Sequence, residues 1–156
     1  MIRTAFLCLI ALAMPSFALT ASPYTIEGEW RFFYLASSDE WKLMFAEEGS
    51  SHSQMYFYCI PNSNEITAIY SVPDVDIRNY VPEIRSESGV YNDDAKIEFN
   101  DVDSYYYVAQ TFRPDSPFLR ELANGEDISA GESIFPLSAP YDGRIFREFA
   151  RACSSA

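Results

Sequence analysis

Two cysteines outside the N-terminal segment constrain the fold of this chain more than any other feature. Cys59 ends the aromatic run MYFYC, and Cys153 lies three residues before the C-terminus. In an oxidising compartment such a pair forms a disulfide, which here would attach the last helix to an early strand. Two separate buried thiols are the alternative. A catalytic cysteine would need a neighbouring histidine, and the sole histidine, His52, lies in a polar segment.

The first 21 residues have the three parts of a secretory signal peptide. Arg3 precedes an apolar run over residues 5–14, and small residues then permit cleavage after Ala18 or Ala21. The apolar run is too short to remain as a membrane anchor. We therefore expect residues 1–21 to be removed, together with their cysteine, and the product to be periplasmic or secreted.

The composition is strongly acidic, with 23 acidic and 11 basic residues and a net charge of −12. Removal of the leader takes away Arg3 alone among the charged residues. A surface of this sign repels nucleic acid and anionic lipid, and it steers cationic molecules toward the protein. We expect the partner to be a protein, and a cationic protein would suit this charge best. We expect no binding to nucleic acid and no insertion into a membrane. The other interpretation is that the charge only maintains solubility.

Short aromatic or alternating segments separated by turn residues predict β-strands in the first two thirds of the chain. These segments are residues 29–35, 40–45, 53–60, 65–72, 96–99 and 104–112. Residues 73–92 contain scattered prolines and charges, and we expect only a short strand at 76–80 there.

The last third changes to helical periodicity. Ser116 and Pro117 predict the start of a helix that ends at Gly125. Residues 127–137 predict one strand, and residues 144–152 a second helix. The sequence thus predicts a single mainly β domain over 22–156. We expect a β-sandwich or flattened antiparallel barrel of about seven or eight strands with two short C-terminal helices.

The final helix has two opposed faces. Its apolar side carries Phe146, Phe149 and Cys153 at helical spacing. Its other side carries Arg144, Arg147 and Arg151, a cationic stripe in an acidic protein, which we identify as a candidate partner contact. The alternative is that these arginines pair with neighbouring carboxylates. Some of the tyrosines at 105, 106 and 107 are a second candidate binding surface, and the alternative is that they belong to the core and the cover of the sheet.

No motif for catalysis, a metal or a cofactor is found. The chain lacks HExxH, GxSxG and a glycine-rich phosphate loop. The acidic pairs at 74 and 76 and at 101 and 103 are not followed by the rest of a calcium loop. We therefore predict that the protein is not an enzyme and assign no catalytic, cofactor or metal residue. An acid–base enzyme with two paired carboxylates remains the alternative.

The C-terminal third resembles the end of the bacterial invasion-associated locus B proteins, which are small exported β-sandwich proteins. The resemblance rests on a helix, a glycine and a proline before the last helix, together with an early tryptophan. The residues are Phe118, Leu119, Leu122, Gly125, Pro136, Leu137, Ser138 and, within Glu29–Arg31, Trp30. It implies an envelope-associated, non-enzymatic role in host-cell or surface interaction.

A second segment is similar to the C-type lysozyme inhibitors. Tyr58-Cys59 resembles their Y-x-C strand, and residues 86–91, with Ser86, Ser88, Gly89 and Tyr91, resemble their S-x-SG-x-x-Y signature but are one residue shorter. The lysine that follows that signature has Lys96 as its nearest counterpart. We therefore expect an exported non-catalytic binding protein of envelope or host-interaction type. The alternative is a periplasmic inhibitor or immunity protein against a cationic wall-degrading enzyme such as lysozyme.

Overall fold

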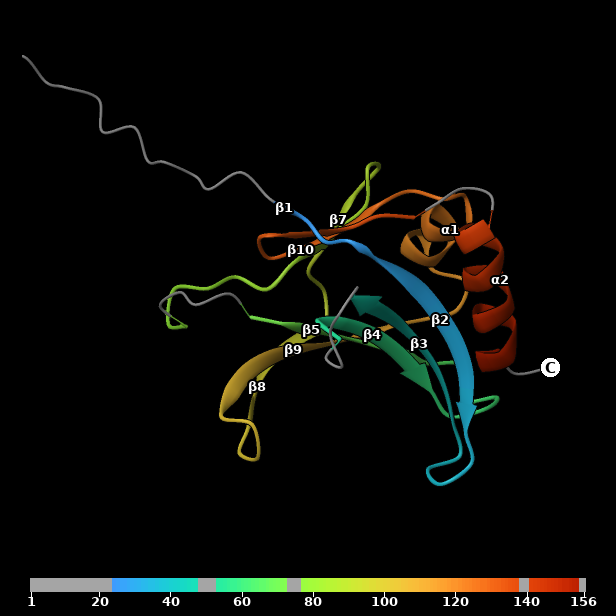
Figure 1. The fold of residues 1–156 in the computed structure, drawn as a ribbon, viewed down its shortest axis with the longest axis horizontal. Coiled ribbons are helices and arrows are strands. Elements are labelled where there is room, and N and C mark those ends of the chain that lie inside the picture. The colour runs from blue at the N-terminus through green and yellow to red at the C-terminus, as the bar shows by residue number, and fades with distance from the viewer. Residues whose placement is uncertain (1–23, 48–52, 73–76, 138–140, 155–156) are drawn as a thin grey trace, which may run out of the picture.

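The computed structural model describes residues 24–47, 53–72, 77–137 and 141–154 (Figure 1). They form two β-sheets and two helices, so the predicted mainly β class is confirmed. The predicted leader, with both cleavage positions, and His52 lie outside these residues.

The larger sheet has six antiparallel strands. In spatial order they are β2 (Gly28–Leu35), β3 (Glu40–Glu47), β4 (Met55–Cys59), β5 (Ile66–Ser71), β9 (Tyr105–Phe112) and β8 (Ala95–Asn100). These strands match the six predicted segments to within two residues at most ends. Alternation places Met55, Phe57 and Cys59 on the buried face of β4, as predicted.

The smaller sheet has five short strands. Their order is β1 (Tyr24–Thr25), β11 (Ser133–Phe135), β10 (Ile128–Ala130), β6 (Ile84–Arg85) and β7 (Val90–Tyr91). The first two pair in parallel and the rest are antiparallel. The described residues thus contain eleven strands, more than the seven or eight predicted, because the sequence pattern does not reveal two-residue strands.

Two sequence predictions in this sheet are wrong. Residues 127–137 form the β10–β11 hairpin rather than one strand, because the chain turns at Gly131, whose φ is 59°. Residues 77–79 form a turn instead of the strand predicted at 76–80. Asp76 itself lies outside the described residues.

The two sheets pack face to face as a sandwich. Phe45 of the larger sheet contacts Phe135 of the smaller one edge to face, with 5.4 Å between ring centroids. Within the described residues the larger sheet is open, since β2 and β8 are its two edges. Of the two predicted architectures, the structure therefore has the sandwich rather than the closed barrel.

Helix α1 (Pro117–Ala123) begins and ends as the sequence predicts. The Ser116 hydroxyl accepts a hydrogen bond from the Leu119 N–H at 3.3 Å, and Pro117 occupies the first turn. Gly125 follows the helix with φ 90°. Helix α2 (Tyr141–Cys153) starts three residues earlier than predicted, because Gly143, which we placed before the helix, lies in its first turn.

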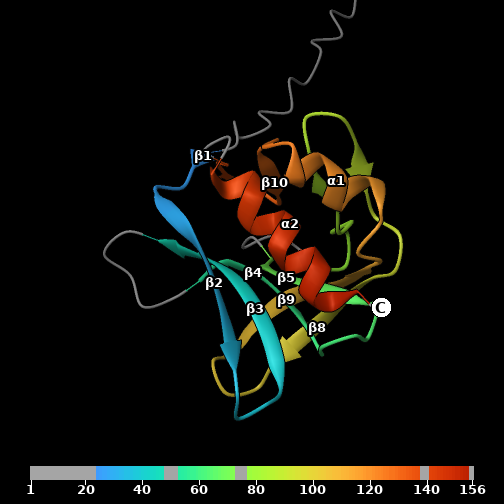
Figure 2. The ribbon, with the colours of Figure 1, turned by 90° about the vertical axis from the view of Figure 1, so that its right-hand side faces the viewer.

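Helix α2 lies across the inner face of the larger sheet (Figure 2). Phe146 packs on Trp30 with 4.9 Å between ring centroids, and Phe149 on Phe32 at 5.8 Å. The predicted disulfide joins Cys153 of this helix to Cys59 at the end of β4, with Cα atoms 5.8 Å apart. The predicted covalent attachment of the last helix to an early strand is therefore confirmed.

The disulfide indicates a non-reducing compartment. Neither of the two helices is long and apolar enough to cross a bilayer, as far as the described residues extend.

We expect the double substitution Cys59→Ser/Cys153→Ser to lower the free energy of unfolding by about 4–5 kcal/mol, because the bond closes a long loop in the unfolded chain. Its partners are 94 residues apart. Urea unfolding of the oxidised, reduced and substituted proteins measures the effect. Equal midpoints for all three would contradict it.

We expect Gly143→Ala to destabilise the protein by about 1–3 kcal/mol. A Cβ at this position would lie 2.7 Å from the Ala123 carbonyl oxygen, a backbone atom that α1 holds in place. In an open helix the same change would stabilise by about 1 kcal/mol. The sign of the change in urea midpoint therefore distinguishes close helix contact from helix propensity.

Candidate functional site

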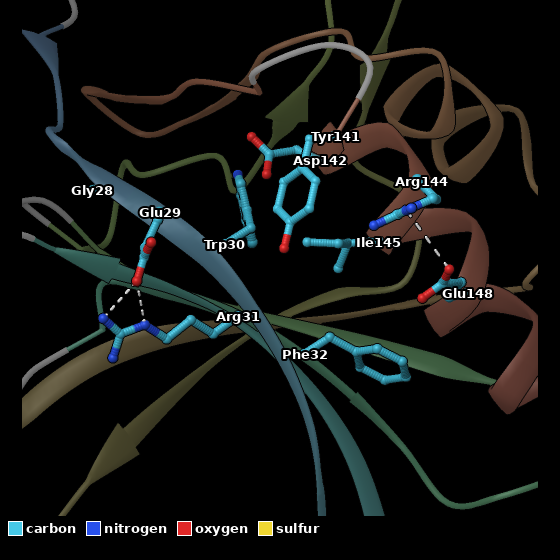
Figure 3. A pocket seen from close by; sticks show the side chains of 10 residues that line it. All are labelled: Gly28, Glu29, Trp30, Arg31, Phe32, Tyr141, Asp142, Arg144, Ile145 and Glu148. Carbon is cyan, nitrogen blue, oxygen red and sulfur yellow. Dashed lines mark hydrogen bonds and ion pairs between the residues drawn. The ribbon is translucent and has the colours of Figure 1, made fainter.

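A groove runs between the edge strand β2 and helix α2 (Figure 3). It has a volume of about 530 Å³. Five consecutive residues of β2 line it on one side, and one face of α2 lines it on the other. The lining residues are Gly28, Glu29, Trp30, Arg31, Phe32, Tyr141, Asp142, Arg144, Ile145 and Glu148.

The floor of this groove combines apolar side chains with the buried carboxylate of Asp142, and its rim is charged. Trp30 and Ile145 are buried, and the indole N–H of Trp30 donates to the Pro136 carbonyl at 3.1 Å, which fixes the ring. Glu29 and Arg31 extend from β2 on the side away from α2, where they pair at 2.6 Å (Figure 3). A largely apolar centre inside a polar border is the usual composition of a protein-binding site, and here the centre also contains one carboxylate.

The strand side of the groove also provides unpaired backbone groups. In the described part of the chain β2 pairs with β3 alone. Alternate residues of an edge strand direct their N–H and C=O groups away from the sheet, where another strand can pair with them. Among the described residues the larger sheet has two edges of this kind, and of these the β2 edge has a helix beside it (Figure 2).

The three arginines of the predicted stripe have different contacts in the structure. Arg144 lines the groove, where its guanidinium lies 5.4 Å from the Tyr141 ring centroid and 3.9 Å from the Glu148 carboxylate. Arg147 instead donates to the Ala123 carbonyl at the end of α1. Arg151 is exposed on the last turn of α2 and has no ion pair within the described residues. Partner contact by these residues stays a prediction, and Arg144 alone belongs to the groove.

The ion pairs on the rim are easily rearranged. Arg144 and Glu148 have side-chain exposures of 60% and 52%, and water screens their attraction. These side chains can therefore exchange their present contacts for contacts with a partner. Sequence reasoning missed the strand half of the site, because no local pattern shows that β2 is an edge.

The residues that resemble the lysozyme-inhibitor signature are bound within the chain. The Ser86 hydroxyl donates to Glu121 at 2.5 Å, and the Tyr91 hydroxyl lies 2.7 Å from both oxygens of the same carboxylate. Ser88 donates its N–H and its hydroxyl to Glu126, at 2.9 and 2.8 Å. These contacts hold the β6–β7 hairpin to α1, so the hydroxyls are already engaged.

The residues that resemble the invasion-associated locus B proteins also have structural roles. Phe118, Leu119 and Leu122 are buried in the core. Trp30 and Pro136, which come from opposite ends of that resemblance, are joined by the hydrogen bond described above. Ser138 lies outside the described residues.

The three predicted surface tyrosines do not share one face. Tyr105 and Tyr107 point away from the sandwich, whereas Tyr106 lies on the other side of β9 against Phe99, with 4.8 Å between ring centroids.

No group of three or more His, Cys, Asp or Glu side chains suited to a metal ion occurs among the described residues. Comparisons of the chain with protein-family models, with curated proteins and with solved structures return no match. The groove and its surroundings are therefore the basis for a functional assignment.

We expect the protein to lose stability between about pH 10 and 12, and Tyr91→Phe to reduce that loss. Burial, followed by the hydrogen bond to Glu121, raises the pKa of Tyr91 from 10.0 to about 12. Because the folded protein favours the neutral phenol, its contribution is complete below pH 10 and disappears as the pH rises through the folded pKa. Urea midpoints from pH 8 to 12 measure this slope. Tyr141→Phe is the control, since its ring is exposed. A slope unchanged by Tyr91→Phe would contradict the assignment.

Proposed function

We propose that this chain is an exported, non-catalytic binding protein of envelope or host-interaction type. Its groove receives an extended segment of a partner polypeptide alongside β2. The observation that carries the proposal is the juxtaposition of an eight-residue edge strand with a helix and a groove of about 530 Å³ between them.

Strand addition explains how such a groove selects its ligand. Backbone hydrogen bonds to an edge strand supply affinity for any extended chain, and pockets for alternate side chains supply specificity. Here every second side chain of the added strand would face α2, where Tyr141, Arg144, Ile145 and Glu148 form one helical face. The buried Trp30 and Ile145 favour an apolar side chain at the centre.

The disulfide and the N-terminal sequence support export. The Cys59–Cys153 bond indicates a non-reducing compartment, and the signal-peptide pattern of residues 1–21 supports the proposal that this is the periplasm or the exterior. Since both sulfurs are bonded to each other, neither can act as a nucleophile. This supports a binding role rather than thiol catalysis.

Peptide selection tests this function. A phage library of random peptides about twelve residues long is panned on the disulfide-bonded protein, and the selected peptides are synthesised. We expect the double variant Tyr141→Ala/Arg144→Glu to weaken their binding about tenfold, because it removes one wall of the groove. Amide hydrogen exchange should show new protection in β2, since the added strand occupies its free backbone groups.

The matched control is Arg151→Glu, which makes the same charge change on the same helix outside the groove. We expect it to leave the dissociation constants unchanged. The function would be wrong if no peptide were enriched, if Arg151→Glu weakened binding equally, or if β2 gained no protection.

A further inference from the structure

The outer face of the six-stranded sheet is uncovered. We define this face by the strand residues that point away from the smaller sheet. They include Phe33, Lys42, Met44, Tyr56, Tyr58, Glu98, Tyr105 and Tyr107. Both helices and the five-stranded sheet pack on the opposite side, and no described helix or strand forms a layer over this one (Figures 1 and 2).

Four tyrosines gather on this face from two strands. Tyr56 and Tyr58 belong to β4 and have ring centroids 6.3 Å apart, and Tyr105 and Tyr107 of β9 have the same spacing. Only β5 separates the two strands, and it contributes Thr67, the buried Ile69 and Ser71 to this face. Burial raises the pKa of Tyr56 to about 12, with smaller contributions from the other three tyrosines. The rings therefore form one half-buried aromatic surface.

The face already carries three basic residues, Arg31, Lys42 and Lys96, and Lys42 lies on an aromatic ring. The Lys42 ammonium lies 4.0 Å from the centroid of the Tyr56 ring, which is the geometry of a cation–π contact. Burial lowers the pKa of this lysine and is opposed by Glu40. Lys42 thus shows how a basic side chain is accommodated here, on a ring and close to a carboxylate.

Carboxylates border the remaining tyrosines. Glu98 accepts the hydroxyl hydrogen bond of Tyr107 at 2.6 Å, and Asp103 lies with Tyr105 in a hollow of about 410 Å³. Neither carboxylate forms an ion pair with a basic residue of the described segments. The whole chain has a net charge of −12. The surface therefore offers aromatic rings together with two carboxylates that form no ion pair within the described segments.

We propose that the outer face binds a cationic segment of a partner polypeptide, whose arginine or lysine side chains lie on Tyr58, Tyr105 and Tyr107. Glu98 and Asp103 pair with the same cations. Aromatic rings alone would also suit a neutral sugar, but the unpaired carboxylates and the net charge attract a cation. This face is separate from the β2–α2 groove, so the inference does not depend on the function proposed for the groove.

The test uses synthetic peptide probes on the disulfide-bonded protein. A peptide of five Arg-Gly repeats is titrated against five Gln-Gly repeats and against chitohexaose, with amide NMR shifts as the readout. We expect saturable binding of the arginine peptide only, with shifts confined to β4, β5, β8 and β9. Its affinity should decrease with rising salt.

Neighbouring tyrosines provide a matched pair of variants. Tyr105 and Tyr106 are 41% and 44% exposed but lie on opposite faces of β9. We expect Tyr105→Ser to raise the Kd of the arginine peptide about twofold to fivefold, as loss of a cation–π contact does, and Tyr106→Ser to leave it unchanged. Glu98→Gln should also weaken binding, whereas Glu132→Gln, the same charge change in the β10–β11 turn, should not. Urea midpoints confirm that the variants are folded.

Three results would overturn the proposal. The first is the absence of saturable binding by the arginine peptide. The second is an equal effect of the two members of either matched pair. Equal effects of the tyrosine variants would show that the peptide does not distinguish the two faces of β9, and equal effects of the glutamate variants would show that it senses only the overall charge. The third is stronger binding of chitohexaose, which would assign the face to carbohydrate. None of these results bears on the function proposed for the groove. That function is tested by variants of α2 and by protection of β2, whereas the NMR shifts expected here lie in β4, β5, β8 and β9.

Discussion

The covalent bond between Cys59 and Cys153 is the constraint on which the arrangement of this protein depends. It joins the end of a strand to the last turn of α2, and the N–H of Asn64 strengthens the junction by donating to the Cys153 carbonyl at 2.9 Å. At the other end of the helix, Gly143 lies close to α1. With both ends held, α2 keeps a constant distance from β2, and the groove between them is preformed. A preformed site costs less conformational entropy on binding.

Because side chains alternate along each strand, the inner and outer surfaces of the six-stranded sheet carry different residues. On β4, Phe57 points inward and packs on Phe146, 5.5 Å between ring centroids, whereas Tyr56 points outward under Lys42. The inner side of the sheet thus carries the helix and the groove, and the outer side carries the tyrosines. An extended segment at the β2 edge and a cationic segment on the outer face would not compete for the same residues.

Much of the fold could be predicted from local patterns, and the errors have specific physical causes. The six long strands, the Ser116 cap and the disulfide partners were recognised because each depends on neighbouring residues or on a simple pairing. The pattern of residues 127–137 predicts one strand, because Gly131 turns the chain without a proline or an Asn-Gly pair to mark the turn. The arginines of α2 were predicted as one surface, but Arg147 is directed to a carbonyl of α1, a contact between elements that periodicity does not encode.

By itself, the sequence determined the mainly β class, the two alternating faces of β3 and β4 and the pairing of Cys59 with Cys153. These properties follow from alternation, composition and cysteine count, all of which are local or nearly so. Only the tertiary structure decided that β2 is an edge and that Tyr56 and Tyr58 share an uncovered face with Tyr105 and Tyr107. Both depend on strand order, which is set by the packing of distant segments, since a strand has the same alternating pattern at the edge of a sheet as at its centre.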